Sequence, residues 1–171
     1  TGATSGIGAE TARQLAASGV DLILTGRRES RLFELKKELM LSNPSISVHC
    51  HAFDITDRTE CEKFREGYFG NEPDILINNA GLAAGFDKAQ NASFDDWDQM
   101  IDTNVRALIN MTRLFLPAMV ARNSGHILNV SSVAGVESYS GGSVYCATKH
   151  AIHAFTKSLK MDLGGTHIRV S

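Results

Sequence analysis

A tyrosine and a lysine at a spacing suited to proton transfer occur in the stretch Tyr145-Cys146-Ala147-Thr148-Lys149. Nothing between Gly142 and Leu163 breaks a helix, so Tyr145 and Lys149 are predicted one turn apart on one helix face. A phenol that exchanges a proton near neutrality must lose about three pKa units from ~10, or roughly 4 kcal/mol. One positive charge at ~4 Å and an effective dielectric of ~20 supplies about that much. The alternative is a surface lysine beside a half-buried ring, because such pairs also arise by chance.

A glycine-rich opening, Thr1-Gly2-Ala3-Thr4-Ser5-Gly6-Ile7-Gly8, leads directly into a helical pattern over residues 9–18. Glycines placed in this way let backbone N–H groups approach a phosphate at a helix N-terminus. The spacing Gly-x-x-x-Gly-x-Gly fits the common Gly-x-Gly-x-x-Gly fingerprint only loosely, and no strand precedes it in this sequence. We predict cofactor contacts from a set of residues in this loop: Gly2, Thr4, Ser5, Gly6, Ile7 and Gly8.

Two arginines, Arg27 and Arg28, follow the β-rich segment 20–25. In dinucleotide-binding folds the end of this strand meets the adenosine ribose, where a carboxylate favours NAD and an arginine favours the 2′-phosphate of NADP. The alternative is that both arginines decorate a helix start, although a helix N-terminus disfavours cations. The sequence therefore predicts NADP as the cofactor.

Strand-like and helical segments alternate along the rest of the chain. Strands are predicted over 46–53, 74–77, 126–130 and 168–170, and helices over 30–41, 57–69, 93–123 and 142–163. The long helix 93–123 is expected to kink near Asn104 and to break at Pro117. Asn104 is unusual among apolar neighbours, and a satisfied polar contact is the alternative to a functional role.

This alternation indicates an α/β protein with a right-handed, doubly wound parallel sheet, formed as a single domain over residues 1–171. Ligands bind such sheets just beyond the carboxyl ends of the strands. Candidate residues fall directly after the predicted strands: Gly2 to Gly8, Arg27, Asp54, Ile55, the run Asn78-Asn79-Ala80-Gly81, and Ser131-Ser132. The convergence of these positions favours an enzyme.

Composition narrows the class further. The chain is 43% hydrophobic with a formal charge of −2, which gives no electrostatic case for nucleic acid or an anionic membrane. Its apolar runs are too short to cross a bilayer, and three cysteines favour a reducing cytoplasm over a disulfide framework. His49 and His51 would share a strand face without a third ligand nearby, so we predict no metal site.

Taken in order, these motifs resemble the short-chain dehydrogenase/reductase family over essentially the whole chain. The resemblance rests on Thr1-Gly2-(x)3-Gly6-x-Gly8, Asn78-Asn79-Ala80-Gly81, Asn104, Ser132 and Tyr145-(x)3-Lys149. It implies that Tyr145 is the general acid/base, that Ser132 binds the substrate oxygen, and that Lys149 serves both Tyr145 and the nicotinamide ribose. It also implies that Asn104 holds a water linking Lys149 to solvent, that Asp54 contacts the adenine side, and that Asn79, Ala80 and Gly81 border the cofactor. Ser131 is the alternative to Ser132, but the family's thirteen-residue step to Tyr145 matches Ser132.

A finer resemblance links the chain to NADP-dependent serine and 3-hydroxy-acid dehydrogenases. It rests on residues 25–28, 102–108 and 142–149, and implies a small 3-hydroxy acid such as serine or allo-threonine as substrate. By this resemblance the fold would lack its first strand and its C-terminal part, and the protein would form a homodimer or homotetramer. The alternatives are a carbonyl reductase of another substrate class, a sugar-nucleotide epimerase or dehydratase, and a non-catalytic NADP-binding module.

Overall fold

The computed structural model describes residues 1–68 and 72–171. Its strands are β1 (Leu22–Gly26), β2 (Val48–Ala52), β3 (Ile75–Asn78), β4 (Gly125–Asn129) and β5 (Ile168–Val170). Its α-helices are α1 (Gly6–Ala17), α2 (Glu29–Ser42), α3 (Arg58–Gly67), α4 (Phe94–Ile101), α5 (Ala107–Arg122) and α6 (Ser143–Asp162). Shorter helical turns are η1 (Ala89–Asn91), η2 (Asp102–Arg106) and η3 (Val133–Gly135). The predicted helix 57–69 ends at Gly67, and Phe69 lies outside the described residues.

Every strand pairing in the described part of the chain is parallel. β1 pairs with β2, and β4 lies between β3 and β5, so the strands form a two-stranded and a three-stranded sheet. Residues Thr1 to Ala3 run between the two sheets: the amine of Thr1 donates to the carbonyl of Ile77 at 2.7 Å, and Ala3 N–H donates to the carbonyl of Thr25 at 3.0 Å. The first residues of the glycine-rich loop are thereby fixed at the ends of β1 and β3.

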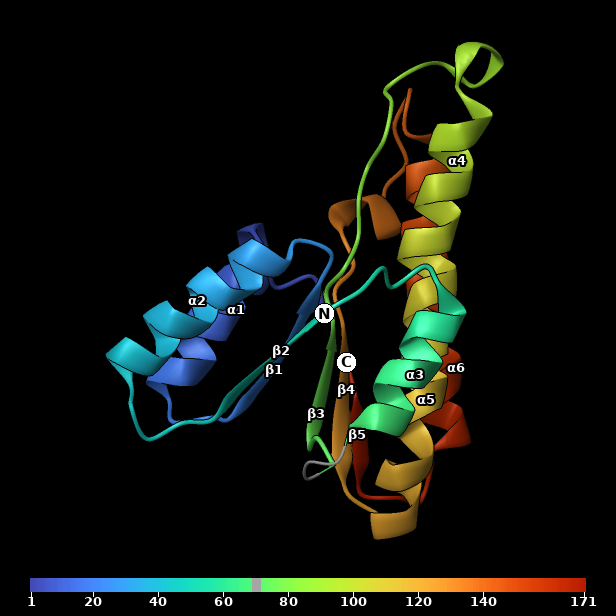
Figure 1. Ribbon diagram of the computed structural model, residues 1–171. Helices are drawn as coiled ribbons and strands as arrows, with labels where there is room; N and C mark the ends of the chain where they lie inside the picture. Colours follow the sequence, from blue (N-terminus) through green and yellow to red (C-terminus); the bar gives the residue numbers. More distant parts are fainter. Residues whose placement is uncertain (69–71) are drawn as a thin grey trace.

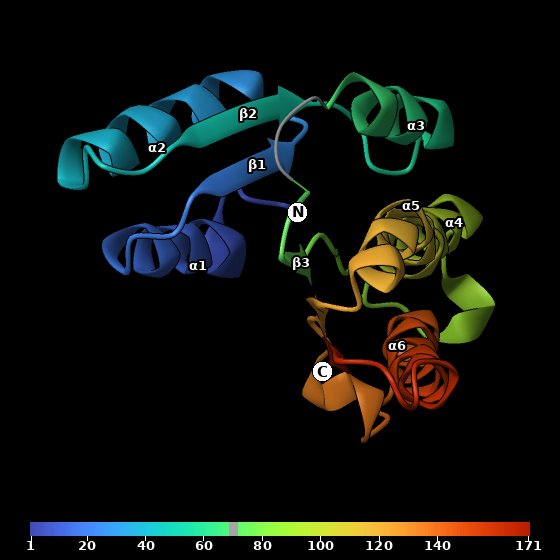
Figure 2. The ribbon, with the colours of Figure 1, turned by 90° about the horizontal axis from the view of Figure 1, so that it is seen from below.

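The helices cover both faces of the strands. Figure 1 shows α1 and α2 on one side of the strands, with α3, α4, α5 and α6 on the other. Seen from below in Figure 2, α4 and α5 run end to end and lie beside α6. This layered arrangement confirms the predicted α/β class, and the carboxyl ends of the strands point to the same edge. No helix among the described residues is long and apolar enough to cross a membrane.

Two apolar cores stabilise the two groups of strands. The first packs small and aliphatic side chains of α1 and α2 against β1 and β2, among them Ala16, Leu24 and Leu32, which are at most 4% exposed. The second packs larger side chains of α3, α5 and α6 against β3, β4 and β5, including Met111 and Phe115 of α5. Both cores follow the helical and strand periods of the sequence, which is why the positions of the elements were predictable.

The long helical stretch 94–122 is interrupted once, at the π-helical turn η2, which contains Asn104. The kink near Asn104 stays a prediction; the structure has the π-helical turn at this place, and the Asn104 side chain lies in the interior, where it is 1% exposed. The predicted break at Pro117 is wrong, because α5 continues through it to Arg122. Pro117 and Arg113 face solvent, so the backbone bond that proline removes lies on the exposed side. Arg65 also donates to the carbonyl of Leu114 at this level, at 3.3 Å.

Buried polar side chains tie β3 and β4 to the helices that cover them. The amide of Asn78 donates to Thr112 of α5 at 3.0 Å and to Asn129 of β4 at 2.9 Å. Asn129 in turn donates to Thr156 of α6 at 3.0 Å. These bonds fix α5 and α6 relative to the strand ends, because a buried amide without its partners would carry a desolvation penalty.

Candidate active site

A cleft of about 460 Å³ opens at the carboxyl ends of the strands. It is lined from the glycine-rich loop, from the segments after β1, β2, β3 and β4, and from α6. Every predicted cofactor-binding residue lines it: Gly2, Thr4, Ser5, Gly6, Ile7, Gly8, Arg27, Arg28, Asp54, Ile55, Asn79, Ala80, Gly81, Tyr145 and Lys149. Residues that sequence reasoning missed, among them Phe53, Leu82 and Thr103, are sequence neighbours of these positions or of Asn104. Their closeness in sequence to a predicted strand end or to Asn104 could have indicated that they line the cleft.

In the glycine-rich loop, the backbone at Gly2 and Gly8 is packed too closely for a side chain. Gly2 has a φ of +68°, and a Cβ on Gly8 would collide with the carbonyl of Gly2 and the side chain of Asn79. Asn79 holds this packing by donating from Nδ2 to the carbonyls of Thr1 at 2.9 Å and Gly2 at 3.3 Å. Gly6 also has a positive φ, but no atom lies near its Cβ position, so the space at the start of α1 is open. The spacing of Gly2 and Gly8 is therefore set by backbone packing, and the opening at Gly6 faces the cleft.

This helix start can hold an anion. α1 begins at Gly6, its N-cap Ser5 makes no side-chain cap, and its first turn carries no acidic residue. Backbone N–H groups and the positive end of the helix dipole therefore face the cleft without a protein anion to neutralise them. A phosphate group suits such a position.

Positive charge lies beside the same loop. The guanidinium of Arg28 donates to the hydroxyl of Thr4 at 2.6 Å and to that of Ser5 at 2.9 Å. Arg27 lies 3.8 Å from the carboxylate of Asp54, and both side chains are largely exposed. Arg28 thus connects the end of β1 to the opening at Gly6, where α1 begins, and Arg27 remains available to a ligand in the cleft.

Tyr145 and Lys149 both lie on α6, as predicted. The ammonium of Lys149 sits over the tyrosine ring, 5.8 Å from its centroid, and donates to the carbonyl of Val130 at 3.2 Å. Lys149 is only 6% exposed, and this burial lowers its pKa from the ordinary value. Because Lys149 is shielded from solvent, its charge is weakly screened and acts on neighbouring groups more strongly than that of a surface lysine.

Asn104 braces this pair without lining the cleft. Its side chain accepts from Leu82 N–H at 2.8 Å, donates to the Leu82 carbonyl at 2.8 Å, and donates to Thr148 of α6 at 3.1 Å. A Cβ on Gly81 would lie 3.2 Å from Asn104 Oδ1, a tight approach, and 3.6 Å from Lys149 Nζ, so Gly81 packs directly against both side chains. Asn104 therefore holds the segment after β3 against the helix that carries Lys149.

The two serines after β4 take different positions. Ser131 lines the cleft, and its hydroxyl donates to the backbone carbonyl of Lys149 at 3.4 Å. Ser132 precedes η3 and accepts from Ala134 N–H at 3.2 Å, and it is not among the residues that line the cleft. The structure thus brings Tyr145 and Lys149 together, places Asn104 behind them, and places Ser132 at the adjoining loop.

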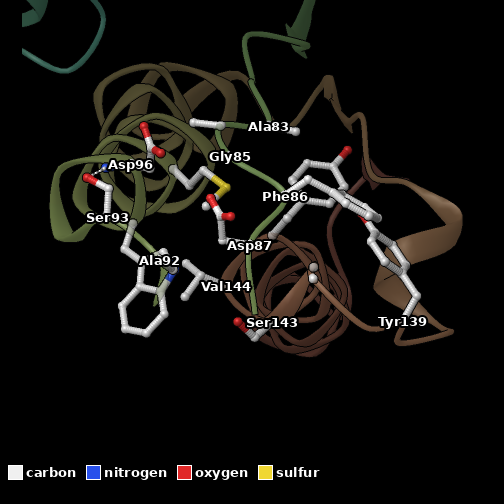
Figure 3. A pocket seen from close by; sticks show the side chains of 16 residues that line it. Ala83, Gly85, Phe86, Asp87, Ala92, Ser93, Asp96, Tyr139, Ser143 and Val144 are labelled. Carbon is white, nitrogen blue, oxygen red and sulfur yellow. Dashed lines mark hydrogen bonds between the residues drawn. The ribbon is translucent and has the colours of Figure 1, made fainter. Parts of the chain in front are cut away.

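A second, smaller cavity of about 50 Å³ adjoins the cleft at Tyr145 and Ala83 (Figure 3). The segment after β3, the start of α4, and the turn before α6 form its walls, with the stacked rings of Phe86 and Tyr139 on one side. Sequence reasoning missed this cavity because its loops have no periodicity and the two stacked rings, Phe86 and Tyr139, are more than fifty positions apart.

The two strand histidines differ in their surroundings, and only His51 packs against other side chains. His51 contacts the ring of Phe64 at a centroid distance of 4.7 Å, and His49 is exposed on β2. Across residues 1–68 and 72–171, no cluster of three or more potential metal ligands forms around them or elsewhere. His51 is therefore part of the aromatic packing between β2 and α3.

A parallel α/β sheet, a glycine-rich helix start and a Tyr–Lys pair at the strand ends together define a dinucleotide-binding class of α/β protein. The short chain dehydrogenase family matches over residues 1–171, and the chain belongs to that family. This confirms the family predicted from the motifs.

Individual relatives are equally similar over the whole chain. NADP-dependent 3-hydroxy acid dehydrogenase YdfG of Escherichia coli O6:H1 is 44% identical over 173 residues, covering 100% of this chain and 68% of the relative. A probable NADP-dependent dehydrogenase of Haemophilus influenzae is 45% identical over 175 residues, covering 100% of this chain and 67% of the relative. The closed form of serine dehydrogenase complexed with NADP⁺ superposes with a TM-score of 0.91 at 44% identity, covering 99% of this chain and 67% of that one. The chain thus spans about two thirds of the length of these relatives.

Proposed function

We propose that this chain transfers a hydride between NADP(H) and a secondary alcohol or its ketone, with a small 3-hydroxy acid of the serine or allo-threonine type as substrate. Allo-threonine would give a ketone, whereas serine is the primary-alcohol member of this class and would give an aldehyde. The observation that carries this proposal is the position of Tyr145 where the large cleft meets the small cavity, with Lys149 of the cleft wall over its ring. The NADP-dependent relatives support both the cofactor and the substrate class.

The cleft residues fit NADP by their chemistry. The uncapped start of α1 suits the pyrophosphate, and Arg27 with Arg28 suits the 2′-phosphate at the end of β1. Asp54 would contact the adenine side, while Asn79, Ala80 and Gly81 would border the nicotinamide half. When bound, the nicotinamide supplies hydride transfer.

The protein's own part is proton transfer and positioning. In the oxidation direction Tyr145, as tyrosinate, accepts the proton of the substrate hydroxyl as the C–H bond breaks. Lys149 stabilises that phenolate through its charge and would also bind the nicotinamide ribose. Ser132 would hydrogen-bond the reacting oxygen after a small movement of its loop, and Asn104 would hold the water that links Lys149 to solvent.

Replacing Tyr145 by Phe tests this assignment. We expect Tyr145→Phe to lower kcat by about 10²–10⁴-fold, because it removes the group that exchanges the proton. The affinity for NADPH, followed by fluorescence titration, should change little. The assay is NADP reduction by full-length protein with serine, 3-hydroxybutyrate and a sugar alcohol. Full activity in the variant would remove Tyr145 from the mechanism, and silence on both acids would remove the substrate class.

We also propose that the protein forms a homodimer or homotetramer through α4, α5 and α6. Apolar side chains are exposed on this layer: Phe94, Ile101, Ile109, Val120 and Met161, with exposed fractions from 38% to 79%. Pairing two copies would remove them from water. Size-exclusion chromatography with light scattering measures the assembly, and a monomer at micromolar concentration would contradict it.

A cytoplasmic location completes the proposal. The three cysteines are unpaired, and two of them, Cys61 and Cys146, are buried. Burial raises the pKa of Cys61 to about 11, which keeps this thiol protonated and unreactive. Such cysteines suit a reducing compartment.

A further inference from the structure

The carbinol carbon of a 3-hydroxy acid can carry two substituents, one that leads to the carboxylate and one that does not. We infer that the small cavity beside Tyr145 receives the substituent without the carboxylate, and that the stacked pair Phe86–Tyr139 limits its size. This inference deepens the proposed function and rests on it. It makes Tyr139 and Phe86 specificity-determining residues for the acid's side chain.

The position of Tyr145 indicates where the reacting carbon lies. Tyr145 and Ala83 belong to the walls of both the cleft and the cavity, so the reacting carbon must stand at their junction. A secondary alcohol carries two substituents at that carbon. One of them therefore faces the cavity while the other stays on the cleft side, and the cavity volume bounds the first.

The wall of the cavity carries negative charge. Among the described residues that line it are Asp87 and Asp96, but no lysine, arginine or histidine. Both carboxylates approach Gly85: a Cβ there would lie 2.9 Å from Asp96 Oδ2 and 4.0 Å from Asp87 Oδ2. Figure 3 shows both side chains on the cavity wall together with Ser93. A substrate carboxylate placed here would be repelled by two like charges without a compensating cation, so it points out of the cavity.

The volume of the cavity limits the substituent that it can hold. About 50 Å³ holds three to five water-sized groups at roughly 10–15 Å³ each, which admits a methyl or ethyl group but not a phenyl ring. The wall that sets this limit is the aromatic pair, whose ring centroids lie 6.1 Å apart at an interplanar angle of 21°.

Two consecutive glycines, Gly141 and Gly142, pack against the aromatic pair. The ring of Tyr139 lies against Gly142, where a Cβ would overlap it, and Phe86 lies against Gly141, where a Cβ would come within 3.0–3.4 Å. Gly141 has a φ of +83°, which other residues rarely adopt. Burial, together with nearby Cys146 and Tyr145, raises the pKa of Tyr139, so its side chain is a neutral phenol at ordinary pH. The consecutive glycines thus seat the two rings at the mouth of the cavity.

The test compares 3-hydroxybutyrate with 3-hydroxy-3-phenylpropionate, measured as kcat/KM at saturating NADP with full-length protein. The unaltered enzyme should prefer the methyl substrate by at least about tenfold, since a hydrophobic pocket discriminates by 10–200-fold per group. Tyr139→Ala should raise the phenyl-to-methyl ratio of kcat/KM by at least about tenfold. Phe86→Ala should raise it in the same direction, and because Phe86 is 74% exposed this variant tests the wall even if Tyr139→Ala does not fold.

Matched variants separate size from other effects. Tyr139→Phe keeps the ring, so the ratio should stay that of the unaltered enzyme. Leu41→Ala, on the far helix α2 and 83% exposed, should change neither the ratio nor the NADP constants. Asp87→Asn, which removes one of the two negative charges of the cavity wall, should change KM for 3-hydroxybutyrate less than about twofold. A larger fall in KM would place the carboxylate inside the cavity and overturn the inference.

The inference and the proposed function fail in different ways. An unaltered enzyme that accepts both acids equally, or a ratio unchanged in Tyr139→Ala and Phe86→Ala, would overturn the inference while leaving the hydroxy-acid function intact. Turnover of other alcohols without turnover of any 3-hydroxy acid would overturn both.

Discussion

The half of the molecule built on β1 and β2 differs from the half built on β3, β4 and β5 in where its polar side chains lie. In the first half Thr25 is the one buried polar residue among those described, and the charged groups at the cleft, Arg27 and Arg28, are exposed. In the second half the buried residues include a set of hydrogen-bonding groups: Asn78, Asn104, Thr112, Asn129, Thr148 and Lys149.

The two halves therefore meet the two substrates of the proposed reaction by different physical means. The first half offers charges on flexible side chains around an open helix start, which suits recognition of an anionic cofactor that comes and goes. The second half fixes its groups by buried bonds such as Asn104 to Thr148, so their geometry is set before any ligand arrives. Substitutions in the first half should change affinity, whereas those in the second should change stability and turnover together.

The largest effect expected from this contrast is at Asn104. Asn104→Ala removes three side-chain hydrogen bonds and leaves the N–H and the carbonyl of Leu82, both partly buried, without this partner, while Thr148 keeps its bond to the Tyr145 carbonyl. We expect a loss of about 2–4 kcal/mol in the free energy of unfolding, at 1–3 kcal/mol for each unsatisfied buried group. kcat should fall as well, because the segment carrying Gly81 loses its anchor. Urea denaturation followed by circular dichroism measures the first quantity.

Thr25→Val is the matched control in the other half. It removes only a hydroxyl from a buried threonine of β1 and keeps the shape of the side chain. We expect a change below about 1 kcal/mol, as for an ordinary neutral hydrogen bond. Equal losses in the two variants would mean that the halves do not differ in the way proposed.

Part of the fold and of the candidate site could be predicted from the sequence, and part could not. The shared helix of Tyr145 and Lys149 was predictable because nothing in that stretch breaks a helix, and the cleft position of most proposed cofactor residues because they directly follow strands. The cavity walls and the choice between Ser131 and Ser132 were not, since they depend on contacts between distant loops. Phe86 and Tyr139 meet only after α4 and α6 have packed. Pro117 was misjudged because its tolerance depends on which side of α5 faces solvent.

Arg27 and Arg28 test the cofactor half at an intermediate size of effect. Arg27→Ala should weaken NADPH binding by about 10–100-fold, equivalent to 1.5–3 kcal/mol for a charged hydrogen bond, and should leave NADH nearly unaffected. Arg28→Ala should weaken both cofactors, because Arg28 also holds Thr4 and Ser5 of the phosphate loop. Fluorescence titration gives the dissociation constants. Neither variant should change the unfolding free energy by more than about 1 kcal/mol, as is usual at exposed positions.

Arg31→Ala is the control for charge alone, since Arg31 is exposed on α2 outside the cleft. Its removal should leave the NADPH constant unchanged. If Arg27→Ala and Arg31→Ala weakened NADPH equally, the effect would be general electrostatics and not recognition of the 2′-phosphate. If Arg27→Ala weakened NADH as much as NADPH, Arg27 would not read that phosphate.

The smallest effect concerns Lys149, which is the one charged side chain among the described buried residues. Burial lowers its pKa below 10.5, so between the folded-state pKa and 10.5 the unfolded chain binds a proton that the folded chain does not. Stability contributed through this group should therefore rise with pH across that interval and be constant below it. Lys149→Met removes the group, so the stability of this variant relative to the unaltered protein should be most favourable near neutrality and decline as pH approaches 10.5. Urea unfolding of both proteins at several pH values measures the difference, in which other titrating groups cancel. A difference independent of pH would show that Lys149 is no costlier to charge than a surface lysine, and the contrast between an exposed cofactor half and a buried catalytic half would then rest on its amides alone.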